Sequence, residues 1–167
     1  MIVSGTTPLL HLTRAGLLDL LPGLYTRVIV PPSVLEETRG RGEPRPEAQV
    51  LGDAVGAWME VRPLSAGERR KSGTFRRAAP VGRGEADSLV LAEALRTAVL
   101  MDDRVAVNLA RMRGVGTPWT TSVVLEAHRR GILDRKAARR ALEDLVASGL
   151  WIRQDVLLRI LAILGEG

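Results

Sequence analysis

The chain has 167 residues and a net charge of +5; 46% of its residues are apolar, but it has only three Trp, one Tyr and one Phe. This length fits one domain with a real core, and a core of Leu, Val, Ala and Ile favours buried strands covered by helices over a β-sandwich. Cysteine is absent, which excludes disulfides and thiolate metal sites, and we expect a cytoplasmic protein that is neither secreted nor membrane-embedded.

The first forty residues alternate between predicted strands and predicted helices. Residues 2–4 are apolar and predict a strand that stops at Gly5, and residues 9–21 predict the helix that follows. A second β-branched run at 27–30 ends at a Pro pair, and a short helix is predicted over 33–38. Two strand-to-helix units in succession favour an α/β fold.

The middle of the chain is less regular. Residues 39–46 hold two Pro and predict a loop, 47–57 predict a helix, and 59–61 predict a short strand. Residues 65–84 show little apolar periodicity, and we expect a mobile or loosely helical basic segment there. Its cationic residues are Arg69, Arg70, Lys71, Arg76, Arg77 and Arg83.

The alternation returns after the basic segment. Residues 85–96 predict a helix, 98–101 a strand and 103–113 another helix, so the β-α-β-α order predicts a parallel sheet. Residues 116–117 are a possible further strand. The remaining predicted helices are 122–130, 136–148 and 155–164.

Acidic residues occur in pairs where the predicted strands end. The carboxyl ends of parallel strands meet at one edge of a sheet, so functional groups gather there. Such a cluster, with only two His in the chain, suits a hard cation such as Mg²⁺ or Mn²⁺ and hence phosphodiester hydrolysis. The alternative is that each pair caps a helix, since acids are favoured in a first turn. The pairs are Glu36 and Glu37, Glu85 and Asp87, and Asp102 and Asp103.

Four segments resemble the PIN-domain family, which includes the Vap-type toxin ribonucleases. They are I-V-S-G-T-T-P-L-L at 2–10, V-P-P-S-V-L-E-E at 30–37, G-E-A-D-S-L-V-L-A at 84–92 and L-M-D-D-R-V-A at 100–106. The resemblance implies a three-layer α/β/α fold with a central parallel sheet, and metal-dependent cleavage of RNA by three or four acids. It spans about the first 130 residues of one domain covering 1–167, and the helices of 131–167 form a C-terminal extension.

The resemblance also implies site residues. Glu37 matches the family's second acid, Glu85 or Asp87 the third, and Asp103 the fourth, with Asp102 and Glu36 as near alternatives. The predicted catalytic residues are Glu37, Glu85, Asp87 and Asp103, and the predicted Mg²⁺- or Mn²⁺-binding residues are these four together with Asp102. The predicted RNA contacts are Thr6, Arg76, Arg77 and Arg83.

The chain departs from the family pattern at its first acid, where Gly5 stands in place of Asp. Loss of one carboxylate removes a ligand and a negative charge, so metal affinity and cleavage are expected to fall. Either the protein is a natural relative that binds without cutting, or Gly5 is an acquired or engineered substitution that spares the host. A requirement for φ > 0 at this position is a structural alternative.

The expected function is therefore that of an impaired ribonuclease, the toxin of a toxin–antitoxin pair. The alternative is a non-catalytic RNA- or protein-binding module of the same fold. Leu157, Leu158, Leu161 and Leu164 form an apolar stripe at helical spacing, which indicates core packing first and a homodimer face or an antitoxin groove second.

Overall fold

Four parallel strands form the centre of the protein in a computed structural model that describes residues 1–40 and 45–165. The strand order is β3-β2-β1-β4, so β1 lies between β2 and β4. Pairing joins Val3 to Ile29 on one side and to Val99 on the other. The strands are β1 Ile2–Ser4, β2 Val28–Val30, β3 Met59–Val61 and β4 Val99–Leu100.

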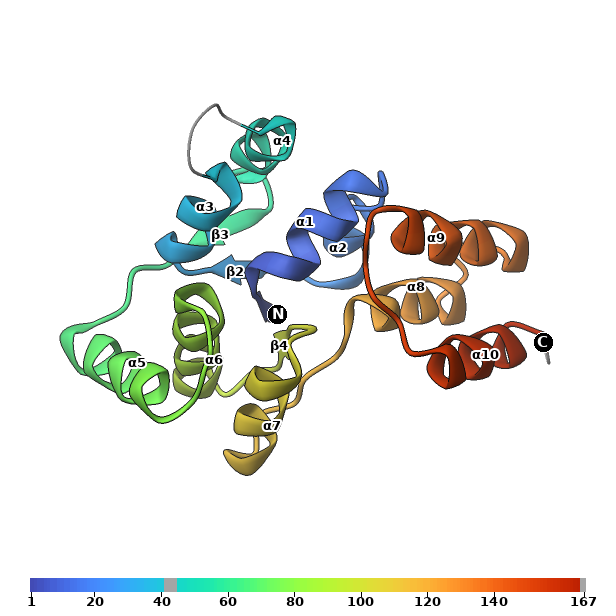
Figure 1. Cartoon of the computed structure of the whole chain (residues 1–167). Coiled ribbons are helices and arrows are strands. Elements are labelled where there is room, and N and C mark those ends of the chain that lie inside the picture. The colour runs from blue at the N-terminus through green and yellow to red at the C-terminus, as the bar shows by residue number, and fades with distance from the viewer. Residues whose placement is uncertain (41–44, 166–167) are drawn as a thin grey trace.

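Helices follow every strand and cover the sheet (Figure 1). Short β-branched runs that end at Gly, Pro or Asp account for this alternation, since each run stops where a helix start signal follows. The helices are α1 Thr6–Arg14, α2 Leu20–Leu24, α3 Pro32–Arg39, α4 Pro46–Ala54, α5 Ala66–Ala78, α6 Arg83–Leu95, α7 Arg104–Met112, α8 Thr120–Arg129, α9 Arg135–Ala147 and α10 Gln154–Ile163.

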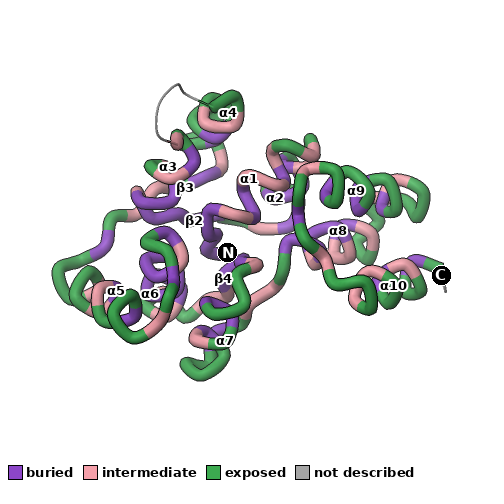
Figure 2. The backbone as a smooth tube through the Cα atoms, viewed as in Figure 1, coloured by how far each residue is buried: buried purple, intermediate pink, exposed green. Residues whose placement is uncertain are grey.

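The two faces of the sheet pack into separate apolar clusters, which makes the fold a three-layer α/β/α arrangement. Successive side chains of a strand point to opposite faces. Accordingly Ile2 and Val28 pack with α1, α2, α8 and α9, whereas Val3 and Ile29 pack with α6 and α7. Figure 2 shows this burial in β1, β2, β4 and α6. The predicted α/β class and parallel sheet are confirmed.

The helix predicted over 9–21 is in fact two helices, α1 and α2. Gly16 has φ 68°, and its amide donates to the Thr13 carbonyl, while the Leu17 amide donates to the Leu12 carbonyl. This pair of bonds is the Schellman arrangement that ends a helix at a glycine in the left-handed region. The prediction overlooked Gly16 as a stop signal.

Two further boundaries differ from the sequence prediction. The helix predicted over 47–57 ends at Ala54, and Gly56 follows at φ 81°. Residues 116–117 form no strand, although the Val99 amide donates to the Gly116 carbonyl at 2.9 Å and the Met101 amide donates to the Pro118 carbonyl at 3.2 Å. Within the loop predicted over 39–46, residues 41–44 lie outside the described residues.

The basic segment is a regular helix and not the loose segment that was predicted. Helix α5 spans 13 residues and begins with a capping box, in which Ser65 accepts from the Glu68 amide and the Glu68 carboxylate accepts from the Ser65 amide. Only Ser72 and Phe75 of this helix are buried. Two buried positions produce no apolar stripe, so apolar periodicity could not reveal this helix.

The C-terminal helices belong to the same apolar cluster as α1 and α8. Leu142 and Leu145 of α9 and Ile160 of α10 are buried in it. Leu158 and Ile163, also on α10, are 59% and 58% exposed. In the described part of the chain, none of the helices is both long and apolar enough to cross a membrane.

Candidate active site

The carboxyl ends of β1, β2 and β4 lie side by side because these strands are neighbours in a parallel sheet. Gly5 and Thr6 follow β1, and the acidic pair at 36–37 lies on the helix after β2. The acidic pair at 102–103 directly follows β4. The observed strand order therefore brings the chain segments that carry these acids to one edge of the sheet.

Glu37 is fixed by two hydrogen bonds from different parts of the chain. The Thr6 hydroxyl donates to Glu37 Oε2 at 2.6 Å, and the Gly84 amide donates to Glu37 Oε1 at 2.8 Å. Both of its oxygens are thus held by donors, which fixes the orientation of the carboxylate. Helix α3, the loop after β1 and the start of α6 meet at this carboxylate.

The glycines of the run 82–85 are explained by close contacts with carboxylates. A β-carbon at Gly84 would lie 2.5 Å from Glu37 Oε2 and 2.6 Å from Thr6 Oγ1. A β-carbon at Gly82 would overlap the carboxylate of Glu85. The start of α6 therefore lacks side chains at Gly82 and Gly84, and the carboxylates of Glu37 and Glu85 lie against its backbone. In a phosphate-binding glycine loop, by contrast, the backbone would face a phosphate group.

Glu85 and Asp103 are the acids electrostatically coupled to this arrangement. Burial raises the pKa of the Glu85 carboxyl, and the negative charges of Glu37 and Asp103 raise it further. Asp103 also caps α7, because its Oδ1 accepts from the Ala106 amide at 2.8 Å. The structure thus brings Glu37, Glu85 and Asp103 together, and for Asp103 the capping role and the site role coincide.

Gly5 has an extended backbone with φ −78° and ψ 179°, which any residue adopts. The φ > 0 explanation for glycine at this position is therefore wrong. A β-carbon there would meet Leu100 O at 3.5 Å and Met101 Cβ at 3.9 Å, both ordinary contacts. The Gly5 amide donates to the Leu100 carbonyl at 2.9 Å, so the backbone is held independently of any side chain. A β-carbon at position 5 therefore makes only ordinary contacts, and the backbone conformation there accepts an L side chain.

Asp87 lies apart from the three coupled acids. Its Oδ2 accepts from the Ser33 hydroxyl at 2.6 Å, and its Oδ1 accepts from the Ser72 hydroxyl at 2.5 Å. The carboxylate is 9% exposed and ties α6 to α3 and α5. Arg83 approaches Asp87 at 3.7 Å and pairs with exposed Glu36 at 2.9 Å. Asp87 therefore acts as an internal brace of the fold, and of the two candidates for the third acid only Glu85 lies beside Glu37.

Asp102 also points away from the coupled acids, toward α8. It accepts from the Thr120 amide at 2.9 Å and from the Thr120 hydroxyl at 2.5 Å. Burial raises the pKa of the Asp102 carboxyl, whereas the Thr120 bonds and nearby His11 act to lower it. The adjacent residues Asp102 and Asp103 consequently have different neighbours: Asp102 binds Thr120, whereas Asp103 interacts with Glu85.

The predicted RNA-contacting arginines lie on the outer side of α5 and at the start of α6. Arg76 and Arg77 are exposed, and Arg77 donates to the Thr74 hydroxyl of its own helix at 3.1 Å. Arg76 and Arg83 line a shallow cavity with Ser72 and Asp87. Thr6, in contrast, is buried and bonded to Glu37. Its position fits the support of a carboxylate better than direct contact with RNA.

The three coupled acids have the oxygen chemistry that Mg²⁺ and Mn²⁺ prefer, but they do not fit such an ion as they lie. Among the described residues, no three Asp, Glu or His side chains are close enough together to hold a metal ion. Each oxygen of Glu37 already accepts one hydrogen bond and keeps one further lone pair. Gly5 contributes no carboxylate to the edge.

The residues that sequence reasoning missed are those that support the acids. The Gly84 amide, Ser33 and Ser72 donate to predicted site carboxylates. The position of Gly84 beside Glu85 was a usable signal for the Gly84 amide. A glycine inside a helix costs stability, so its presence there suggests a close contact. The two serines are separated by 39 positions and carried no signal.

A family model described as DUF3368, a PIN domain, matches residues 1–166 of the chain. The chain therefore belongs to the PIN-domain family. This confirms the predicted family and supports a nuclease-like fold. No curated protein matches the chain significantly.

Proposed function

We propose that this protein is a PIN-type ribonuclease relative whose phosphodiester cleavage is impaired by the absence of a carboxylate at Gly5. The observation that carries the proposal is that Glu37, Glu85 and Asp103 lie near one another at the carboxyl edge of the sheet, where burial and then the charges of Glu37 and Asp103 raise the pKa of the Glu85 carboxyl. Mutual repulsion of three acids at one sheet edge is costly and typical of functional sites. A purely capping role would leave these carboxylates dispersed.

The restored site would consist of Asp at position 5 with Glu37, Glu85 and Asp103. Position 5 directly follows β1, which lies between β2 and β4, the strands that precede Glu37 and Asp103. A fourth carboxylate adds a ligand and a negative charge, which supports Mg²⁺ or Mn²⁺ binding. Asp87 and Asp102 belong to the supporting structure in this proposal, because serine and threonine donors hold them elsewhere.

Comparison of three forms tests the proposal: the protein as it is, Gly5→Asp, and Gly5→Asp combined with Asp103→Asn. We expect Gly5→Asp to gain Mn²⁺ affinity by calorimetry and Mn²⁺-dependent cleavage of RNA, and the added Asp103→Asn to remove both gains. Asp103→Asn changes the shape of the side chain little and keeps an oxygen that can accept a hydrogen bond, so we expect the double variant to fold.

If Gly5→Asp neither binds Mn²⁺ more tightly nor cleaves any RNA tested, the ribonuclease proposal fails. The protein is then a non-catalytic RNA- or protein-binding module of PIN fold. Thermal melting of each variant serves as the control, because unfolding would imitate the loss of cleavage.

The finer parts of the proposal are a toxin role in the cytoplasm, an antitoxin partner and a homodimer, built on one domain over 1–167. The exposed apolar side chains Leu158 and Ile163 of α10 support an interface on this helix. Co-purification with the product of an adjacent small reading frame tests the antitoxin. Light scattering of the isolated protein tests the homodimer.

A further inference from the structure

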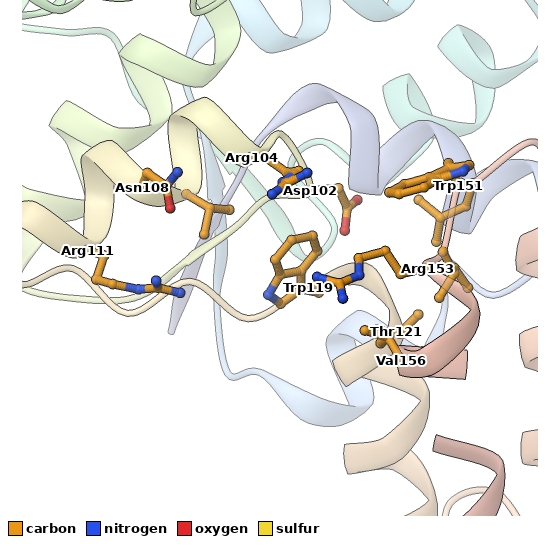
Figure 3. A pocket seen from close by; sticks show the side chains of 12 residues that line it. Asp102, Arg104, Asn108, Arg111, Trp119, Thr121, Trp151, Arg153 and Val156 are labelled. Atoms are coloured by element: carbon orange, nitrogen blue, oxygen red, sulfur yellow. The ribbon is translucent and has the colours of Figure 1, made fainter. Parts of the chain in front are cut away.

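A cavity of about 410 Å³ lies beside the acidic edge, between the start of α7, the start of α8 and the link from α9 to α10 (Figure 3). Its walls include two of the chain's three Trp residues, Trp119 and Trp151, together with Arg104, Arg111 and Arg153. Asp102 forms part of the lining. None of these side chains is used by the three coupled acids.

The two indoles present apolar surface to solvent at this cavity. Trp119 is 41% exposed and Trp151 is 73% exposed. Figure 3 shows Asp102 between the two rings in the view, with Arg153 beside Trp119. Exposed aromatic faces next to cationic groups are the combination that binds single-stranded nucleic acid, because each base has a face that stacks.

The charges around the cavity favour a polyanion. Arg104 and Arg111 are exposed on α7 and form no ion pair with any described residue. Arg153 is different, since Asp155 accepts from it at 3.0 and 2.9 Å. Two unpaired guanidinium groups therefore remain near the indoles to contact phosphates.

Asp102 gives the cavity a fixed acceptor. The Thr120 amide and hydroxyl hold one oxygen each, so the carboxylate is oriented while lone pairs remain on both oxygens. A carboxylate in this position can accept from the amino group of an unpaired base, as acidic side chains do with cytosine.

The cavity is continuous in sequence with the acidic edge. Asp102 lines it, and Asp103, the next residue, is coupled to Glu85.

We propose that this cavity holds an unpaired base of single-stranded RNA, stacked on Trp151 and Trp119, with Arg104 and Arg111 on the flanking phosphates. The inference deepens the proposed function, on which it rests for the choice of RNA as the polymer. It assigns to the protein a base-binding subsite separate from the acids.

Binding of a fluorescein-labelled oligocytidylate, measured by anisotropy, tests the subsite without any need for cleavage. Trp151→Ala is expected to weaken binding about tenfold, because stacking is lost. The double variant Arg104→Gln with Arg111→Gln is expected to lower the slope of log affinity against log salt by about 1.4. An abasic chain with the same phosphates is expected to bind the unmodified protein about tenfold more weakly than oligocytidylate.

Trp58→Phe and Arg139→Gln are the matched controls, since Trp58 lines a different cavity and Arg139 lies exposed on α9. Both are expected to bind oligocytidylate as the unmodified protein does. Equal affinity of Trp151→Ala and the unmodified protein, with Trp151→Ala folded by circular dichroism, overturns the subsite and leaves a protein ligand as the occupant. Failure of Gly5→Asp to cleave RNA overturns only the ribonuclease proposal, because the binding assay does not depend on cleavage.

Discussion

The Thr6 hydroxyl donates to the Glu37 carboxylate at 2.6 Å, so the residue pair that follows β1 is tied to the helix that follows β2. The Gly84 amide completes this junction from the opposite side. Three segments that are distant in sequence therefore meet at the Glu37 carboxylate, and they leave no space for a side chain at Gly84.

Gly84→Ala is expected to destabilise the protein. Its added methyl group would lie 2.5 Å from Glu37 Oε2 and 2.6 Å from Thr6 Oγ1, and such overpacking costs about 1–3 kcal/mol. Gly52→Ala is the control, because nothing lies within 4 Å of a β-carbon at this helical position. Urea denaturation should show a gain of about 0.5 kcal/mol for Gly52→Ala. Equal free energies of unfolding for the two variants would contradict the close contact.

Glu85→Gln is expected to stabilise the protein at neutral pH. Burial and the charges of Glu37 and Asp103 raise the pKa of Glu85 above its ordinary value. Stability from such a group is fully present below the ordinary pKa and is lost as pH rises through the raised pKa of the folded state. Melting temperatures should therefore favour Glu85→Gln near pH 7 and converge with those of the unmodified protein at acidic pH.

Glu143→Gln is the matched control for this pH dependence, since Glu143 is exposed on α9. It should melt with the unmodified protein at both pH values. A melting temperature of Glu85→Gln below that of the unmodified protein near pH 7 would mean that the ionised Glu85 is stabilised, against the burial and repulsion described.

Ser72→Ala is expected to cost about 1–3 kcal/mol, because it leaves an oxygen of buried Asp87 without its donor. Thr74→Ala, on the exposed side of the same helix, should change the free energy of unfolding by less than about 0.5 kcal/mol. In the Gly5→Asp background, Ser72→Ala should leave Mn²⁺ affinity unchanged. A loss of affinity would place Asp87 among the ligands.

Ser65→Ala is expected to weaken the start of α5 by about 1 kcal/mol, because the capping box loses one of its two bonds. Hydrogen exchange should report faster exchange of the first-turn amides of α5, with the amides of α6 unchanged. Protection in α5 that is unaffected by Ser65→Ala would mean that the cap does not hold this helix.

The strands and the acid-bearing edge could be predicted because their signals are local. A β-branched run followed by glycine, proline or aspartate marks both the strand and its end, and parallel order then places Glu37 and Asp103 on one edge. The choice between Glu85 and Asp87 was also within reach. Glu85 and Asp87 are two positions apart on a helix and therefore about 200° apart around its axis, so their side chains cannot both face the same site.

The supports could not be predicted, because they depend on distant partners. Helix α5 is held by Ser72 against Asp87 and by Phe75, whose ring centroid lies 5.3 Å from the Arg113 guanidinium. Each partner comes from another part of the chain. The cavity between Trp119 and Trp151 is equally invisible in sequence, since only the fold brings these residues to one place.

The edge of the sheet at β4 has a consequence for self-assembly. The Val99 and Met101 amides donate to the carbonyls of Gly116 and Pro118, so a turn of the same chain occupies the groups that an incoming strand would need. Open strand edges invite other chains to add and grow into fibres, and a proline on the covering turn offers no donor in return. Addition of a further strand at β4 is thereby hindered, because the outward amides of Val99 and Met101 already have partners within the chain.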